Sequence, residues 1–452
     1  MKIIIVGAGV AGLSAYMQLK KLLPGPGSHT IVVYEAHRNP APSDVPGPVA
    51  ETEPAALTDS AAVVGNVIAL VPTALRVLRY IDDDLYALFR SRGYRNETYR
   101  FRTARCHSLA TTTTDDHKTP RECTVSCPRA VLRDCLLETV GESNIQYRKA
   151  VAVDLSGAKP VVRFADGGEE SADLVLGADG VRSVVKKAVL GPTQDAAHFS
   201  PHYEGFCGVG GFLQVENLPA SVLDQKSVVF TFGTTGSFGY CSAAPQEQGT
   251  LGWWSNWGHP EIPHSNVMPT EEIRRQLRDR HGTWRDPVIR YVVENMTTDR
   301  IYPIWTTPEL PFWGARGAVL LGDAAHTLPA TSGQGAGQAL EDSVVFSLLL
   351  ASHLGDAVPE AEAIRMAAKG LFDIQAPRVA AIKRQSRNLY LTDRRIENVF
   401  FEYIYYLYLY LLTRFPILSR MVLGTVFTAP EHSDPVERVR NYLNKESSKK
   451  TS

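Results

Sequence analysis

The chain opens with the stretch Lys2-Ile3-Ile4-Ile5-Val6-Gly7-Ala8-Gly9-Val10-Ala11-Gly12-Leu13, and this stretch decides the fold. Its apolar run suits a strand buried on both faces, and a GxGxxG turn follows directly. Gly7 makes the tight turn, Gly9 lets the backbone approach a pyrophosphate, and Gly12 lets the next helix pack closely. A helix over 10–22 would present its free N–H groups and the positive end of its dipole to phosphates. The stretch predicts the start of a dinucleotide-binding fold.

A second apolar run, 30–34, ends at Glu35, which lies 23 positions after Gly12. An acidic residue at the tip of the second strand accepts both hydroxyls of an adenosine ribose and disfavours a 2′-phosphate. The bound nucleotide is therefore expected to be FAD or NAD rather than NADP. The alternative is an ordinary strand-turn-helix unit with a surface glutamate.

The composition describes a globular chain without a strong charge. Its 452 residues are 44% hydrophobic and carry a formal net charge of −1, so nothing attracts it globally to nucleic acid. Its six cysteines contain no CxxC pair, which indicates unpaired thiols and no metal site. Because the first strand begins at residue 2, the sequence predicts no signal peptide and a cytoplasmic location.

A second block pairs a buried strand with a turn. The segment 172–180 ends in a Gly-Ala-Asp-Gly turn, where Asp179 can bond local N–H groups and Arg182, and it predicts a second wall of the nucleotide site. Upstream, a proline begins a helix that holds Arg129 at its N-terminal end. Arg129 either meets a phosphate or ribose of the nucleotide or makes only a surface salt bridge.

A third block, 317–323, is again a buried strand, and it ends at Gly322 and Asp323. A carboxylate there is well placed to bond a ribityl or ribose hydroxyl. A helix beginning at Gly335 and Ala336 follows, and its bare N–H groups can face an anion. Because a reduced flavin is negatively charged near N1 and the C2 carbonyl, such a helix start suits it. Together, the three motifs and this helix start predict that the bound nucleotide is FAD.

The segment 206–256 changes to alternating β-rich sequence with aromatic residues and glycines. This pattern predicts an antiparallel sheet, which we interpret as the floor of a substrate chamber. No cluster of Arg or Lys occurs in it to hold a carboxylate, so a hydrophobic, electron-rich substrate is expected. Tyr240 is the candidate catalytic residue; the alternative is a tyrosine that only packs in the sheet.

Three motifs, Gly7-x-Gly9-x-x-Gly12, Asp179-Gly180 and Gly322-Asp323, occur in this order. Together they resemble the class A flavin-dependent monooxygenases, the p-hydroxybenzoate or salicylate hydroxylase-like family, including those of secondary-metabolite pathways. The match spans roughly residues 2–350. Two positions depart from the family pattern, because its Gly-x-Gly-Ile run reads Gly65-Asn66-Val67-Ile68 here and its Pro-Asn pair reads Pro72-Thr73.

The resemblance implies that Glu35, Arg129 and Asp323 are FAD ligands and that Gly65 and Ala336 lie near the isoalloxazine or ribose. It also implies a reaction in which NADH or NADPH, bound transiently, reduces FAD. O2 would then form a flavin C4a-hydroperoxide that hydroxylates or epoxidises the substrate. The difficult chemistry would belong to the cofactor.

Two other classes remain as alternatives. A flavin-dependent halogenase or a dehydrogenase would share the fold, but a halogenase needs a Trp-x-Trp-x-Ile-Pro segment, which 254–259 does not match. A non-catalytic nucleotide-fold binding protein would not require the second and third motifs together.

The predicted fold class is α/β, with a Rossmann-type FAD-binding domain interleaved with an antiparallel-sheet substrate domain and followed by C-terminal helices. The predicted domains are an FAD-binding domain over 1–200 with an insertion at 37–64, a β-rich substrate domain over 201–300, a continuation of the FAD-binding domain over 301–360, and a C-terminal helical region over 361–452.

The most apolar stretch lies in this last region. Its uninterrupted run, 403–412, has 10 residues, roughly half of the about 20 needed to span a bilayer. The tyrosines could instead place the helix flat on a membrane, as a peripheral contact with Arg394, Arg395 and Arg414 at its ends. The alternative is a helical cap on the protein body or on a second subunit.

Overall fold

The computed structural model describes residues 1–25, 27–38, 67–116, 121–191, 198–215, 226–245, 248–356, 358–389, 399–414 and 434–450. Gly65, Arg394, Arg395 and most of the 37–64 insertion lie outside the described residues. The mixed α/β fold with C-terminal helices that the sequence predicts is confirmed.

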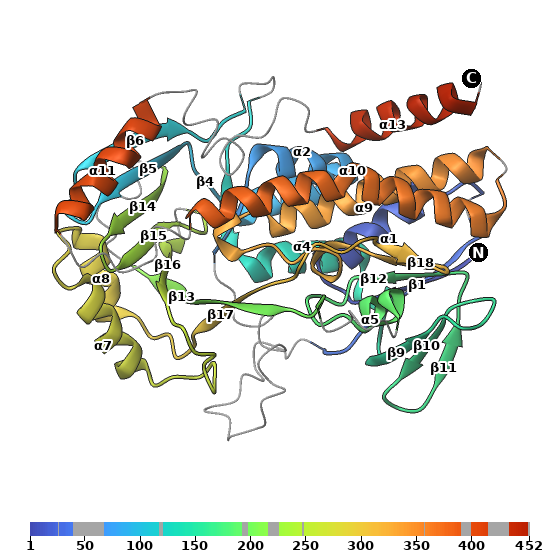
Figure 1. The fold of residues 1–452 in the computed structure, drawn as a ribbon, viewed down its shortest axis with the longest axis horizontal. Helices are drawn as coiled ribbons and strands as arrows, with labels where there is room; N and C mark the ends of the chain where they lie inside the picture. The colour runs from blue at the N-terminus through green and yellow to red at the C-terminus, as the bar shows by residue number, and fades with distance from the viewer. Residues whose placement is uncertain are drawn as a thin grey trace.

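The first large sheet carries the predicted nucleotide edge (Figure 1). Its six described strands run in the order β18 (Gly314–Ala315), β19 (Ala318–Leu320), β12 (Leu174–Gly177), β1 (Lys2–Val6), β2 (Thr30–Glu35) and β8 (Ile145–Tyr147). β1 pairs in parallel with both β2 and β12, and the register sets Val6 beside Tyr34 and Gly177. Gly177 in turn lies beside Leu320 of β19. The carboxyl ends of these strands therefore meet at one edge, where open α/β sheets bind ligands.

Helices cover this sheet, and α9 lies at their centre. They are α1 (Val10–Leu22), α2 (Pro72–Ile81), α3 (Asp83–Arg92), α4 (Arg129–Val140), α5 (Val184–Leu190), α9 (Gly335–Gly355), α10 (Glu360–Leu389) and α13 (Pro435–Lys450). α9 is buried on nearly all sides, including its acidic residues Glu341 and Asp342, and α1, α2, α10 and α13 pack against it. Figure 1 shows α9 and α10 side by side above the sheet.

The second large sheet extends beyond the predicted 201–300 range. Its order is β17 (Tyr302–Thr306), β13 (His202–Gln214), β16 (Thr250–Gly258), β15 (Gly236–Ser242), β14 (Ser227–Gly233), β5 (Thr98–Thr103) and β6 (Ser108–Thr113). β5 and β6 come from within the predicted first domain, and β5 pairs with β14 in parallel, whereas the other pairs are antiparallel. One face is covered by α7 (Thr270–His281) and α8 (Pro287–Asn295).

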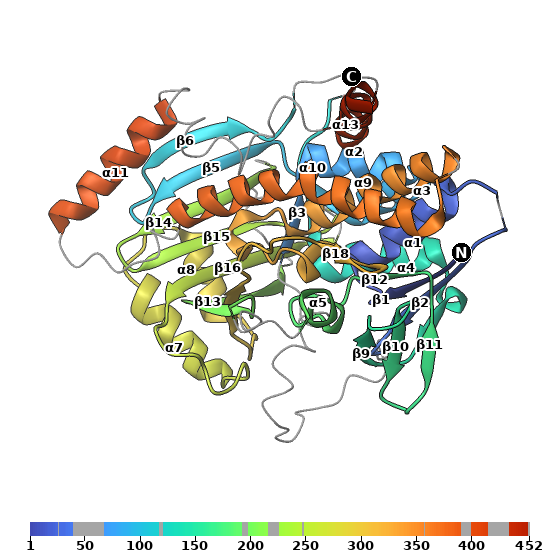
Figure 2. The same cartoon turned by 45° about the vertical axis from the view of Figure 1, so that its right-hand side comes forward.

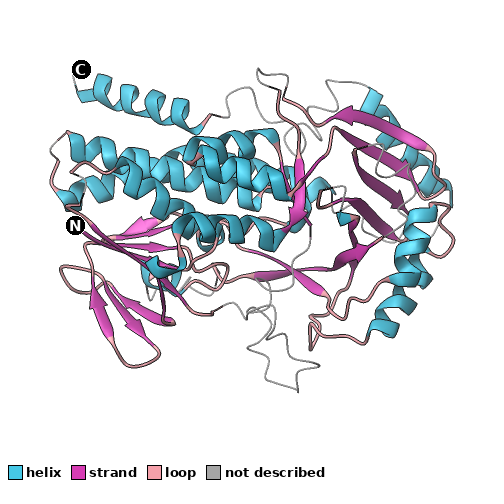
Figure 3. Ribbon diagram, turned by 180° about the vertical axis from the view of Figure 1, so that it is seen from behind, coloured by secondary structure: helices cyan, strands magenta, loops and turns pink. Residues whose placement is uncertain are grey.

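Two small sheets complete the described strands (Figure 3). One consists of β3 (Val67–Leu70), β7 (Val125–Pro128) and β4 (Tyr94–Arg95), and the other of β9 (Ala150–Asp154), β10 (Val161–Phe164) and β11 (Glu169–Ser171). A Cβ added to Gly252 of β16 would lie 2.2 Å from the Val67 side chain of β3. The first small sheet therefore packs on the face of the second large sheet that α7 and α8 leave open.

The C-terminal region places two helices far apart. α13 packs on α9, whereas α11 (Val399–Arg414) lies at the outer edge of the second large sheet, beside β6 (Figure 2). None of the described helices combines the length and the apolar character that crossing a bilayer requires.

Candidate cofactor site

The three glycine motifs meet at the carboxyl edge of the first sheet with no space for side chains between them. Gly7 has a φ of +104°, and a Cβ added there would lie 2.4 Å from the carbonyl oxygen of Ala178. A Cβ added to Gly322 would lie 3.1 Å from the Cβ of Ala11 on α1. The first motif thus contacts both the second and the third, as one site requires.

The start of α1 is open on the side where a phosphate would bind. Gly9 is the N-cap residue, and no side chain caps the helix. A Cβ added to Gly9 would meet nothing within 4 Å, whereas one added to Gly12 would lie 1.9 Å from the carbonyl oxygen of Gly7. Gly12 therefore serves close packing, and the space at Gly9 would accommodate a pyrophosphate held by helix N–H groups.

Glu35 and the start of α4 flank this turn. The Glu35 carboxylate accepts the Ala8 N–H at 2.7 Å, so it lies at the tip of β2 beside the glycine turn. Arg129 is exposed as the first residue of α4. Arg133, one turn further, donates from Nε to the Ala8 carbonyl oxygen at 3.3 Å. The sequence reasoning missed Arg133, although its i+4 spacing from Arg129 was the available signal.

A buried lysine lies near the second and third motifs. Asp179 accepts the Val184 N–H at 2.7 Å through one oxygen, while its other oxygen is buried without a hydrogen-bond partner among the described residues. Burial raises the pKa of Asp179. Lys186 donates to the Val181 carbonyl oxygen at 2.7 Å, and burial lowers its pKa to about 8 against the opposing effects of Asp179 and Asp323. The charge of Asp179 thus acts on Lys186, whereas Arg182, the predicted partner of Asp179, is exposed.

The start of α9 is also open. Gln334 is its N-cap residue but makes no capping bond through its side chain, and a Cβ added to Gly335 would meet nothing within 4 Å. Ala336 follows in the first turn. Gly333, Gln334, Gly337 and Gln338 line a small pocket together with residues 69–71, Thr73 and Ala74. The segment that departs from the family pattern therefore borders the helix start predicted to face the flavin.

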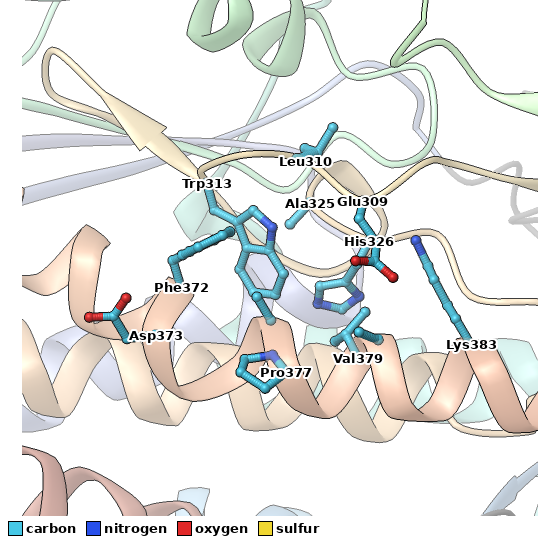
Figure 4. A pocket seen from close by; sticks show the side chains of 12 residues that line it. Glu309, Leu310, Trp313, Ala325, His326, Phe372, Asp373, Pro377, Val379 and Lys383 are labelled. Carbon is cyan, nitrogen blue, oxygen red and sulfur yellow. The ribbon is translucent and has the colours of Figure 1, made fainter.

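A buried carboxylate of α9 accepts a hydrogen bond from the backbone of the third motif. Asp342 of α9 accepts the Gly322 N–H at 2.8 Å and lies 2.7 Å from Nε2 of His326. Burial lowers the pKa of His326, but Asp342 opposes this effect, and the net shift is upward. Figure 4 shows His326 beside Trp313 in a cavity of about 480 Å³ between the 309–313 loop and α10. None of the predicted FAD ligands lines this cavity.

Tyr240, the candidate catalytic residue, lies in the core of the second large sheet. Its hydroxyl donates to Asp286 at 3.0 Å, and the side chain belongs to the core between the sheet and α8. Burial raises the pKa of the Tyr240 hydroxyl far above its ordinary value. β3 packs on the other face of the sheet, so this position favours the alternative of a packing tyrosine, and the catalytic role stays an untested prediction.

The observed site fits FAD: two uncapped helix starts can face anionic groups, an acid stands at the tip of β2, and Asp179 retains a buried oxygen without a partner. This arrangement defines a dinucleotide-binding flavoprotein. A family model described as an FAD binding domain matches residues 84–362, and the chain belongs to that family.

Curated relatives and solved structures agree with this assignment. Salicylate hydroxylase of Pseudomonas putida is 28% identical over 271 residues, which cover 57% of this chain and 60% of that protein. Aurachin C monooxygenase/isomerase of Stigmatella aurantiaca is 30% identical over 54% of this chain and 60% of its own length. The match thus spans about three fifths of these relatives. The fold resembles Klebsiella pneumoniae HpxO complexed with FAD and uric acid, with a TM-score of 0.71, 18% identity, and coverage of 95% and 97% of the two chains.

Proposed function

We propose that this protein is an FAD-dependent monooxygenase that uses NADH or NADPH and O2 to hydroxylate or epoxidise a hydrophobic, electron-rich small molecule. The observation that carries the proposal is the aromatic face of the second large sheet, which lies toward β3 and the cofactor edge. Bound FAD would supply hydride acceptance and O2 activation. The protein would bind the substrate, orient it and exclude water.

This face combines large aromatic side chains with glycines. Trp254 is half-buried and lies over Gly239, where an added Cβ would come within 2.2 Å of the indole. Phe230, also half-buried, packs edge-on against Trp254 with ring centroids 5.6 Å apart and stacks on Phe101 at 5.5 Å. Because such a glycine lets a rigid aromatic ring lie directly on the sheet, the face is flat and apolar and suits a flat apolar ligand.

The ion pair of Arg102 and Asp286 lies on the other face of this sheet. Arg102 lies 3.4 Å from Asp286, in the layer with Tyr240. Asn256 is a half-buried polar side chain on the aromatic face, where it adjoins Gly208. An amide can bond a phenol or enol hydroxyl but cannot neutralise a carboxylate. This supports an uncharged substrate, oriented through Asn256.

Purified protein should carry FAD that acid precipitation releases, and NADH or NADPH oxidation should rise when a substrate is added. Uncharged phenols, enols and alkenes of secondary-metabolite size should be screened against small benzoates. A preparation that binds no FAD would overturn the cofactor assignment. Stimulation by small anionic benzoates alone would overturn the proposed substrate class.

Trp254→Ala should raise the KM of a stimulating substrate by tenfold or more, because it removes a wall of the proposed chamber. The matched control is Tyr291→Ala, which removes an exposed aromatic side chain from α8. Both variants should retain FAD. Equal effects of the two changes on KM would place the substrate elsewhere.

A further inference from the structure

α11 has two different faces. Its inner face packs against the second large sheet, where the Tyr406 hydroxyl donates to Glu402 at 2.7 Å and to the Phe232 carbonyl oxygen at 3.2 Å. Its outer face exposes a set of large apolar side chains, from Phe400, which is 68% exposed, to Leu411, which is 40% exposed. Among the side chains of α11 that the structure describes, the set is Phe400, Phe401, Tyr403, Ile404, Leu407, Tyr408, Tyr410 and Leu411.

Side chains of different types occupy different positions around the outer face of the helix. At about 100° per residue, these eight side chains cover roughly half of the helix circumference. Phe400, Ile404, Leu407 and Leu411 form its central line, and tyrosines 403, 408 and 410 lie toward its borders. A tyrosine has an apolar ring and a polar hydroxyl, so it is suited to the boundary between an apolar phase and water.

Among the described residues, two basic side chains flank this face. The one acidic residue of α11, Glu402, is buried on the inner face. The guanidinium of Arg105 lies 5.6 Å from the Tyr403 ring centroid, and Arg414 is exposed at the end of the helix. A central apolar line, tyrosine borders and basic margins match the layers of an anionic lipid surface.

From these observations we infer that α11 docks the protein on the surface of an anionic membrane, with the helix axis in the membrane plane. Figure 2 shows α11 at the outer edge of the molecule, where a flat surface can reach it. A half-circumference apolar face is wider than the narrow seam by which two helices pair, which favours a bilayer over α11 of a second copy. Docking would bring the enzyme to a phase in which an apolar substrate concentrates. The inference itself does not depend on the proposed reaction.

Flotation of the full-length, FAD-loaded protein tests this inference. The probes are vesicles of phosphatidylcholine with 30% phosphatidylserine and vesicles of phosphatidylcholine alone. The wild type should float with the anionic vesicles. The double variant Ile404→Ser and Leu407→Ser should lower the bound fraction at least tenfold, and Arg105→Gln should lower it severalfold on anionic vesicles only.

The matched control is the double variant Ile262→Ser and Val267→Ser, which changes two aliphatic side chains that are about as exposed but lie outside α11. It should float like the wild type. Flavin content and thermal midpoint show which variants are folded, and sizing without lipid reports the oligomeric state. Wild-type protein that does not float overturns the inference. So does a lipid-free dimer that the Ile404 and Leu407 changes convert to a monomer, because the occupant is then a second copy.

Discussion

Replacing Arg438 by alanine is expected to lower both the stability of the protein and its affinity for FAD, although Arg438 is not among the predicted FAD ligands. Arg438 lies on α13, and its guanidinium donates to Glu341 of α9 at 2.6 Å and to the side-chain oxygen of Gln375 on α10. Gln375 donates to Asp342 at 2.9 Å, and Asp342 accepts the Gly322 N–H at 2.8 Å. A continuous chain of hydrogen bonds therefore joins the C-terminal helix to the third glycine motif.

The size of the effect follows from what remains after the change. Breaking a fully buried ion pair costs about 3–5 kcal/mol, and a hydrogen bond to a charged group contributes about 1.5–3 kcal/mol. Glu341 keeps its second partner, Arg378, at 3.0 Å, so the full penalty does not apply. We expect Arg438→Ala to lower the free energy of unfolding by about 2–4 kcal/mol and to weaken FAD binding up to about tenfold, or 1.4 kcal/mol.

Urea unfolding of the apoprotein and fluorescence titration with FAD measure the two quantities separately. Arg440→Ala is the matched control, because Arg440 is an exposed arginine on the same helix. Arg438→Lys should recover only part of the loss, since an ammonium lacks the planar fork that reaches two acceptors. The reasoning is refuted if Arg438→Ala and Arg440→Ala change stability equally, or if FAD affinity is unchanged in an unstable Arg438→Ala protein.

Two further predictions concern the site itself. Gly12→Ala should lower the free energy of unfolding by about 1–3 kcal/mol and abolish FAD binding, because the new methyl group would collide with the Gly7 carbonyl. Gly9→Ala should leave the stability of the apoprotein unchanged and weaken only FAD binding. Unfolding curves and FAD titration separate the two outcomes. Lys186 has a pKa of about 8 in the folded protein against an ordinary 10.5, so folding disfavours its charged form. Because the unfolded chain keeps this proton up to a higher pH, the free energy of unfolding should rise by at most about 3 kcal/mol between pH 8 and 10.5. Lys186→Met should be more stable than wild type at pH 7 and lack this rise; an identical pH profile would show that the lysine is not buried in solution.

The cofactor edge of the first sheet could be predicted from the sequence because it is built from local patterns. Each motif is a short strand with its own turn, and parallel pairing then aligns the strand ends without further information. The face of the sheet on which Tyr240 lies could not be predicted from the sequence. Alternation divides a strand into two faces, but which face α7 and α8 cover depends on contacts between distant segments. The second sheet likewise takes β5 and β6 from a part of the chain that precedes it by about a hundred residues.

The path from α13 to the glycine motif shows why some site residues leave no sequence signal. Arg438 and Glu341 are 97 positions apart, and neither belongs to a motif or a periodic pattern that marks it as a partner of the other. Glu341 and Asp342 look like acids on an exposed helix turn, yet α9 is buried on nearly all sides. Buried charges of this kind are stable only when every surrounding element supplies its hydrogen bond. The helices that cover α9 therefore belong to the energetics of the cofactor site, although no residue of α10 or α13 was among its predicted ligands.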